Sequence, residues 1–110
     1  MGWLSIAARV AVRYARGLVR RAAKVDQSQE EIVVCLRLIG ASVQSMAAIG
    51  KGCPDLLIGY KGAWYVAECK TGEKAEFTPD QLQWALDAKG SPPLRFNSAG
   101  DAMAWAAGVK

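Results

Sequence analysis

Residues 50–70 read GKGCPDLLIGYKGAWYVAECK, and this stretch decides the fold. Two largely apolar runs, 55–60 and 63–70, flank the dipeptide Lys61-Gly62. A glycine in a two-residue connection favours the tight turn of a β-hairpin. The stretch therefore predicts two antiparallel strands, with an aspartate at the start of the first and a glutamate and a lysine at the end of the second.

The turn also predicts the register of the two strands. With those two residues as the loop, Asp55 is placed directly opposite Glu68. Opposed side chains of an antiparallel pair lie on one face, with Cβ atoms about 4.5–5.5 Å apart. Alternation along the strand places Lys70 on the face of Glu68. Two carboxylates so close repel each other unless a cation lies between them.

A divalent cation resolves this repulsion. The chain has no histidine, which excludes histidine-based triads and histidine-ligated zinc, so a metal must be held mainly by oxygen. Mg²⁺, or Mn²⁺ in its place, suits a few carboxylate oxygens and keeps several waters. With Lys70 to meet an anionic substrate or activate a water, these parts suffice for metal-assisted phosphodiester hydrolysis. The competing interpretation is a plain surface Glu–Lys pair beside a turn that Asp55 begins.

The N-terminal half of the remaining chain predicts one helix and one strand. At 110 residues the chain is long enough for a single core. A helix begins at Asp26 or Ser28, either of which can cap it, and ends at Gly40. A strand follows at about residues 42–48. Together with the hairpin, this predicts a helix followed by a three-stranded meander.

The C-terminal half predicts a helix, an edge strand and a last helix. The motif at 78–81, TPDQ, is a capping box with proline in the first turn, and the helix it starts is expected to end at Gly90. Pro92 and Pro93 permit only an edge strand over 94–96. The last helix opens at Ser98. The helix after the capping box is expected to bury three apolar side chains: Leu82, Ala85 and Leu86.

Positive charge is concentrated near the N-terminus. Residues 1–24 carry six basic residues and no acid, whereas the remainder carries eight basic and ten acidic residues. The spacing within 3–24 predicts a helix with one basic face. That face consists of Arg9, Arg13, Arg16, Arg20 and Lys24. It fits a solvated surface, a stripe that contacts nucleic-acid phosphates, or a helix on a membrane surface, and the sequence leaves these alternatives open.

The cysteines and the N-terminal pattern indicate a cytoplasmic protein. Three cysteines, odd in number and without a CxxC pair, favour free thiols in a reducing compartment. Arginines interrupt the apolar N-terminus from position 9 onward, which argues against a membrane span. The apolar residues precede the basic ones, the reverse of a secretory signal. No stable membrane insertion is expected.

Four separated blocks resemble one family. Pro54-Asp55 and the triplet 68–70, ECK, resemble the signature of PD-(D/E)xK nucleases. Together with EEIVVCLRLIGASV and FTPDQLQW, they are similar to the small phage-type nucleases of the VRR-NUC and archaeal Holliday-junction-resolvase groups. The resemblance covers roughly residues 26–105 in the same order and suggests a phage or bacterial source.

The resemblance implies an α/β fold with a mixed sheet. Its restriction-endonuclease-like core contains a helix, a three-stranded meander, a helix, a strand and a helix. The core would occupy residues 26–110, and a basic amphipathic helix at 1–25 would be an addition to it. The site is expected at the opening of the sheet.

The resemblance also implies roles for five residues. Asp55 and Glu68 are similar to the metal-binding carboxylates, and the backbone carbonyl of Cys69 to a further ligand. Lys70 matches the catalytic lysine. Gln81 matches a glutamine that points toward the site from the start of a helix, a role compatible with its place in the capping box.

One position departs from the family pattern. A glutamate usually stands on the first core helix, and here that position holds Gln29. Gln29 shares a face with Ile32 and is expected to point toward the site, where an amide holds a water but supplies no charge. Glu30 is turned by about 100° from it and would substitute only if the helix started irregularly.

The resemblance implies a divalent-metal-dependent DNA endonuclease that selects branched substrates, as a junction resolvase does. The basic residues near the N-terminus and Lys51, in a Gly-Lys-Gly loop, would contact phosphates. The core is small and offers little surface to a DNA duplex. A homodimer or higher assembly is therefore expected. The alternative is a catalytically weakened nuclease-fold protein that binds DNA, for which Gln29 is the motivating observation.

Overall fold

A helix, a three-stranded meander, a second helix, a strand and a last helix follow one another along the chain. The computed structural model describes residues 27–70 and 76–110. The expected α/β fold with a mixed sheet is confirmed, whereas the expected basic helix at 1–25 lies outside the described residues. In chain order the elements are α2 (Gln27–Leu38), β1 (Ser42–Ser45), β2 (Leu56–Tyr60), β3 (Ala63–Cys69), α3 (Pro79–Asp87), β4 (Leu94–Phe96) and α4 (Ala99–Gly108).

The four described strands form one sheet in the order β1-β2-β3-β4. β1, β2 and β3 run antiparallel, and β4 lies parallel to β3 at the edge. The predicted hairpin register is confirmed, because Tyr60 pairs with Ala63. Lys61 and Gly62 have φ angles of 50° and 83°. A two-residue hairpin turn whose twist matches that of the strands requires positive φ at both loop positions.

β1 is shorter than the predicted strand over 42–48. It ends at Ser45, and the chain then turns, with the Ile49 N–H donating to the carbonyl of Met46 at 3.0 Å. The preceding helix ends as predicted. α2 stops at Leu38 and Gly40 follows with a φ of 98°, a left-handed conformation that glycine adopts at little cost.

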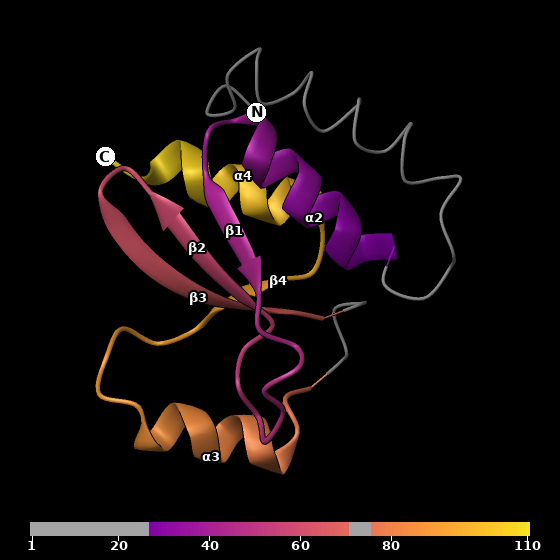
Figure 1. Ribbon diagram of the computed structural model, residues 1–110, viewed down its shortest axis with the longest axis vertical. Coiled ribbons are helices and arrows are strands. Elements are labelled where there is room, and N and C mark those ends of the chain that lie inside the picture. The colour runs from indigo at the N-terminus through magenta and orange to yellow at the C-terminus, as the bar shows by residue number, and fades with distance from the viewer. Residues whose placement is uncertain (1–26, 71–75) are drawn as a thin grey trace.

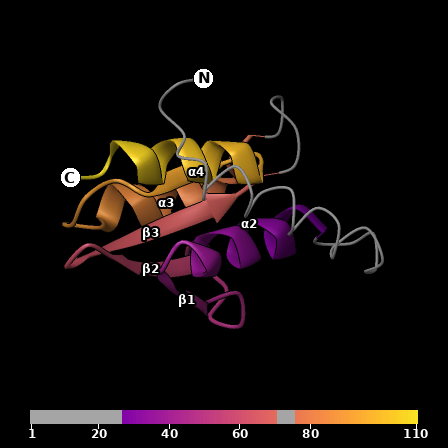
Figure 2. The same ribbon diagram turned by 90° about the horizontal axis from the view of Figure 1, so that it is seen from above.

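The core lies between one face of the sheet and two helices. Figure 1 shows α2 and α4 on one side of the sheet, and Figure 2 shows them side by side. Ile32 and Leu36 of α2 and Met103 of α4 are fully buried against Leu56 and Ile58 of β2. Burial of such side chains stabilises the fold by about 1.5–3 kcal/mol each. The aromatic ring of Trp105 completes this layer against Tyr60, Tyr65 and Phe96, with centroids 4.9–5.9 Å apart.

α3 lies apart from the other two helices, on the opposite side of the sheet (Figure 1). The prediction that it buries Leu82, Ala85 and Leu86 is wrong: no residue of α3 is buried, and the leucines are 52% and 74% exposed. The reason is that only the face with Trp84 and Ala88 approaches the sheet, and within residues 27–70 and 76–110 no further layer covers the other faces. The helix also ends at Asp87, before the predicted Gly90.

The predicted starts of α3 and α4 are confirmed, whereas Asp26, a predicted cap of α2, lies outside the described residues. Thr78 caps α3 in a capping box, in which its side chain accepts from the Gln81 N–H while the Gln81 side chain accepts from the Thr78 N–H. Ser98 caps α4 by accepting from the Asp101 N–H at 3.2 Å. In the parts of the chain that the structure describes, no helix has the length and apolar character needed to cross a bilayer.

The loop before β2 touches the first turn of α3 at Gly52. This glycine has a φ of 81°, and a Cβ built on it would collide with the backbone carbonyl of Asp80 and lie 2.8 Å from the Gln81 nitrogen. The loop and the helix therefore approach so closely that only glycine fits. Because Asp55 follows three residues later, this contact holds two parts of the candidate site together.

We predict that Gly52→Ala lowers the free energy of unfolding by about 2–4 kcal/mol, because it adds a backbone collision to an unfavourable φ. Denaturant unfolding measures the change. Gly50→Ala is the matched control: its φ of 70° is equally unfavourable, but nothing lies within 4 Å of its added Cβ. That control should lose only about 1–2 kcal/mol. Equal losses in the two variants would refute the close approach.

Candidate functional site

The two carboxylates of the hairpin meet at its open end, on the sheet face away from α2 and α4. Asp55 immediately precedes β2, and the established register places it opposite Glu68 of β3. An Asp55 Oδ2 oxygen accepts from the backbone N–H of Cys69 at 2.9 Å. The Asp55 carbonyl accepts from the Met46 N–H at 2.7 Å. Backbone contacts on both sides thus fix the aspartate.

Glu68 is the one buried charged residue of the described chain, with 4% of its surface exposed. Its Oε1 accepts from Nε2 of Gln81 at 2.9 Å. The Oε1 of the same glutamine accepts from the Thr78 N–H at 2.8 Å. The two expected positions of Gln81, in the capping box and facing the carboxylates, therefore occur together, and the start of α3 is tied to β3.

The pKa of Glu68 is raised from 4.5 to about 7, and burial of the carboxyl is the largest cause. A hydrogen bond with the Asp55 side chain and the negative charge of Asp55 act in the same direction, whereas the charge of Lys70 and a hydrogen bond with the Asp55 backbone act against it. About half of the Glu68 carboxyl groups therefore retain a proton near pH 7 when no cation is bound. A divalent cation would take the place of that proton.

Two cations and an aromatic ring border the carboxylate pair. Lys70 continues β3, and its N–H donates to the Phe96 carbonyl at 3.1 Å. The Lys70 Nζ lies 5.9 Å from the centre of the Phe77 ring, and the Arg95 guanidinium carbon lies 5.7 Å from the same centre. Contacts of this length between cations and an aromatic face are attractive. Phe77 thus stands beside both positive charges.

The sequence reasoning did not include Arg95 or Phe77 in the site. Arg95 pairs with Glu68 in the parallel β3–β4 ladder, so it shares the sheet face of the carboxylates, and its Nε donates to Oδ1 of Asn97 at 2.9 Å. This position of Arg95 follows only from the parallel pairing of β4 with β3. Phe77 stands in the FTPDQLQW block, but nothing in its spacing indicates contact with cations.

The two cysteines near the site are free thiols. Burial, followed by the charges of Asp55 and Glu68, raises the pKa of Cys69 to about 12. Burial and the same two carboxylates also raise the pKa of Cys53. Both thiols therefore stay protonated at neutral pH, and Cys69 has only its backbone oxygen to offer a hard cation.

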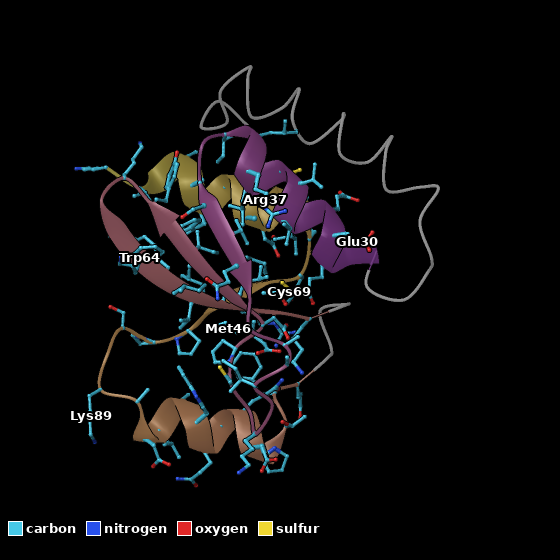
Figure 3. The ribbon with its side chains drawn as sticks, viewed as in Figure 1. Glu30, Arg37, Met46, Trp64, Cys69 and Lys89 are labelled. Carbon is cyan, nitrogen blue, oxygen red and sulfur yellow. The ribbon has the colours of Figure 1, made fainter. Side chains whose placement is uncertain are left out.

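Other predicted site residues lie farther from the pair or outside the described part. Gln29 is half-buried in the first turn of α2, whereas Glu30 is exposed at that end of the helix (Figure 3). Lys51 lines a hollow of about 530 Å³ with Asp80 and Asp87 of α3. Two of its neighbours in this hollow are therefore acidic. The predicted phosphate contacts at Arg9, Arg13, Arg16, Arg20 and Lys24 lie outside the described residues.

The carboxylate pair fits a hard divalent cation by the chemistry of its donors. Among residues 27–70 and 76–110, no three acidic or cysteine side chains form a metal cluster. The site thus offers two carboxylates, and the Cys69 backbone adjoins them through its N–H, which donates to Asp55. Mg²⁺ binds through one or two carboxylates, retains waters and uses substrate phosphates for the rest, so it suits such a small donor set.

Comparison with known proteins finds no match for this chain among protein-family models, curated proteins or solved structures. The site is therefore interpreted from its own residues. These are the opposed carboxylates of Asp55 and Glu68, the Gln81 side-chain amide that donates to Glu68, and two cations, Lys70 and Arg95, on the same sheet face.

We predict that Glu68 makes the metal-free protein less stable as pH rises from about 4.5 to 7. The folded state holds the proton more tightly than the unfolded chain, so ionisation in this range favours unfolding. The difference between the two pKa values corresponds to about 3 kcal/mol. Denaturant unfolding in EDTA across this range measures the effect.

Glu68→Gln should remove this pH dependence. Above pH 7 the variant should be more stable than the wild type, because an amide has no charge to bury. Glu76→Gln changes an exposed carboxylate outside the pair and should retain the wild-type profile. A Glu68→Gln profile parallel to that of the wild type would show that the buried glutamate is not the group that titrates.

Proposed function

We propose that this protein is a divalent-metal-dependent endonuclease that hydrolyses phosphodiester bonds in DNA. The observation that carries the proposal is the opposition of Asp55 and Glu68 across the hairpin, with Lys70 on the same face. Two carboxylates held together at a cost in stability are typical of a site that binds a cation. The resemblance of the sequence blocks to PD-(D/E)xK nucleases supports the same function.

Each residue has a distinct part in the proposed reaction. Asp55, Glu68 and the Cys69 carbonyl hold Mg²⁺ or Mn²⁺, which when bound supplies Lewis acidity toward the phosphate. The Lys70 ammonium lies beside the scissile phosphate and stabilises the negative charge that develops there. Gln81 fixes the orientation of the Glu68 carboxylate through its 2.9 Å hydrogen bond. Gln29, from the first turn of α2, would position water by hydrogen bonding.

The proposed substrate is branched DNA, as the resemblance to junction resolvases implies. The described residues carry seven basic and eight acidic side chains, so their charge alone does not attract a polyanion. The basic residues near the N-terminus would supply phosphate contacts and a salt-sensitive affinity. Lys51 would add a contact only where the DNA reaches past the acidic side chains of α3.

A second function is a DNA-binding protein with the nuclease fold and weakened turnover. The favouring observation is Gln29, which puts a neutral amide where the resembling nucleases have a carboxylate. Only two carboxylates then remain to compensate the charge of a divalent cation. Under this alternative the protein binds branched DNA, and no divalent metal supports cleavage.

We predict that Lys70→Ala lowers the rate of metal-dependent cleavage about 10²- to 10⁴-fold, the usual contribution of one positioned catalytic group. The measurement uses a labelled four-way junction, a flap and a linear duplex of matched sequence with Mg²⁺, Mn²⁺ or EDTA. Lys61→Ala is the control, because Lys61 lies at the turn of the same hairpin and donates to the Val109 carbonyl. It should cleave as the wild type does.

Tight binding without cleavage in either metal would favour the second function. Gln29→Glu, which restores a carboxylate on α2, would then be expected to produce metal-dependent cleavage. Cleavage that persists in EDTA, or that Lys70→Ala leaves unchanged, would contradict the proposed site.

We also propose a homodimer, with the exposed stripe of α3 as the contact. Leu82 and Leu86 lie one turn apart, so they share a face, and both are more than half exposed. A two-fold pairing of two such helices would bury four leucines and place two sites in one assembly.

Leu82→Glu/Leu86→Glu should convert the dimer to a folded monomer, measured as a halved mass by light scattering. Glutamate is a good helix former, so α3 is expected to persist. Leu38→Glu replaces a leucine of α2 that is 50% exposed and should leave the mass unchanged. A wild-type protein of monomeric mass would exclude this contact.

A further inference from the structure

Trp64 is a large, exposed aromatic side chain on the sheet face that carries the carboxylates. It pairs with Gly59 across the hairpin. A Cβ at Gly59 would lie 2.9 Å from Cζ3 of the Trp64 ring and 2.5 Å from the Ser42 hydroxyl. The ring therefore occupies the space over the glycine. Yet 69% of Trp64 is exposed, so most of this large aromatic side chain remains accessible to solvent.

The ring borders a groove between the sheet and α3. A cavity of about 210 Å³ is lined by Trp64, Leu57 and Val66 on the sheet side and by Trp84 and Ala88 on the helix side. The loop 90–92, Gly-Ser-Pro, also lines it. The volume is that of about seven water molecules, which suits one flat heterocyclic ring. Two indoles in the lining favour stacking as the mode of binding.

The groove is aligned with the candidate site. Trp64, Val66, Glu68 and Lys70 alternate along β3 and so share one face. Trp64 lies four residues from Glu68, about 13 Å along the strand. That length corresponds to about four stacked nucleotides at the rise of B-form DNA. Figure 3 shows Trp64 on the hairpin and Cys69 farther along it. A strand cut at the carboxylates would thus pass close to the indole.

We propose that the groove between Trp64 and Trp84 binds an unpaired nucleobase of the substrate. This inference rests on the proposed nuclease function and specifies its substrate as DNA with a single-stranded arm. Base stacking on a tryptophan needs an accessible aromatic ring and no matching side-chain donors, and the exposed side chain of Trp64 meets this need. The cations at the other end of this face, Lys70 and Arg95, meet the phosphates of the same arm.

The geometry favours a base over a second protein copy as the occupant. On the α3 side, Trp84 and Ala88 face the groove, whereas Leu82 and Leu86 lie about 120–160° away from them around the helix. The proposed dimer contact therefore uses the other side of the helix and leaves the groove open. A stacking site and a protein interface can thus be altered separately.

Direct binding tests the inference. Fluorescence anisotropy in EDTA compares a blunt duplex with the same duplex carrying a six-nucleotide thymine tail or an abasic tail of equal length. The two tails carry equal charge and differ only in bases. Wild type should bind the thymine tail about 5- to 100-fold more tightly than the abasic tail, the range expected when one base stacks on an aromatic side chain.

Variants assign the preference to the groove. Trp64→Ala should abolish the preference for bases and leave affinity for the blunt duplex unchanged, while Trp64→Phe should retain part of it. Leu38→Ala, at an exposed position of α2 outside both the groove and the proposed dimer contact, should change neither. Thermal unfolding monitors the folded state, and Trp64→Phe keeps the ring over Gly59, so the preference remains testable if the alanine variant is unstable.

Equal affinity for thymine and abasic tails, or no binding of any DNA, would overturn the inference. A dimer that becomes a monomer in Trp64→Ala would overturn it too, because the groove would then be a protein interface. Cleavage of the same DNAs with Mg²⁺ is scored separately. If the wild type prefers the thymine tail but cleaves none of the DNAs, the proposed nuclease function is refuted and the base-binding groove stands. If it cleaves DNA without preferring the thymine tail, the groove is refuted and the nuclease function stands.

Discussion

The hydrogen-bond register of the β2–β3 hairpin is the constraint on which the candidate site depends. A two-residue turn with positive φ at Lys61 and Gly62 sets that register, and the register brings Asp55 opposite Glu68 at the far end of the strands. A slip by one residue would turn Glu68 and Lys70 into the core and expose Ala67 and Cys69. The apolar packing that favours this register therefore also aligns the carboxylates.

The site lowers the stability of the fold that carries it. A buried carboxyl with a pKa of about 7, beside a second carboxyl, is unfavourable in its charged form. The core under the opposite sheet face contributes the stability that offsets this cost. Bound cation would neutralise the pair, so the same arrangement that destabilises the empty site favours binding.

Sequence reasoning predicted the elements well where local chemistry decides them. The hairpin, the Thr78 capping box, the Ser98 cap and the glycine stop after α2 each follow from a few neighbouring residues. The pairing of Asp55 with Glu68 followed from turn length alone. The burial of α3 was wrong, because its apolar pattern predicts a stripe but not whether another layer exists to cover it. The place of Arg95 was missed, since it depends on a parallel pairing across 27 residues of chain.

α3 is an excursion between β3 and β4 that carries part of the site but none of the buried core. Local opening of this helix would expose little apolar surface, so hydrogen exchange of its amides need not require global unfolding. Both Gln81 and Trp84 would leave the sheet in such an opening. Substitutions in α3 can therefore change which ligands bind to the sheet face beside it, while the core on the other face keeps the protein folded.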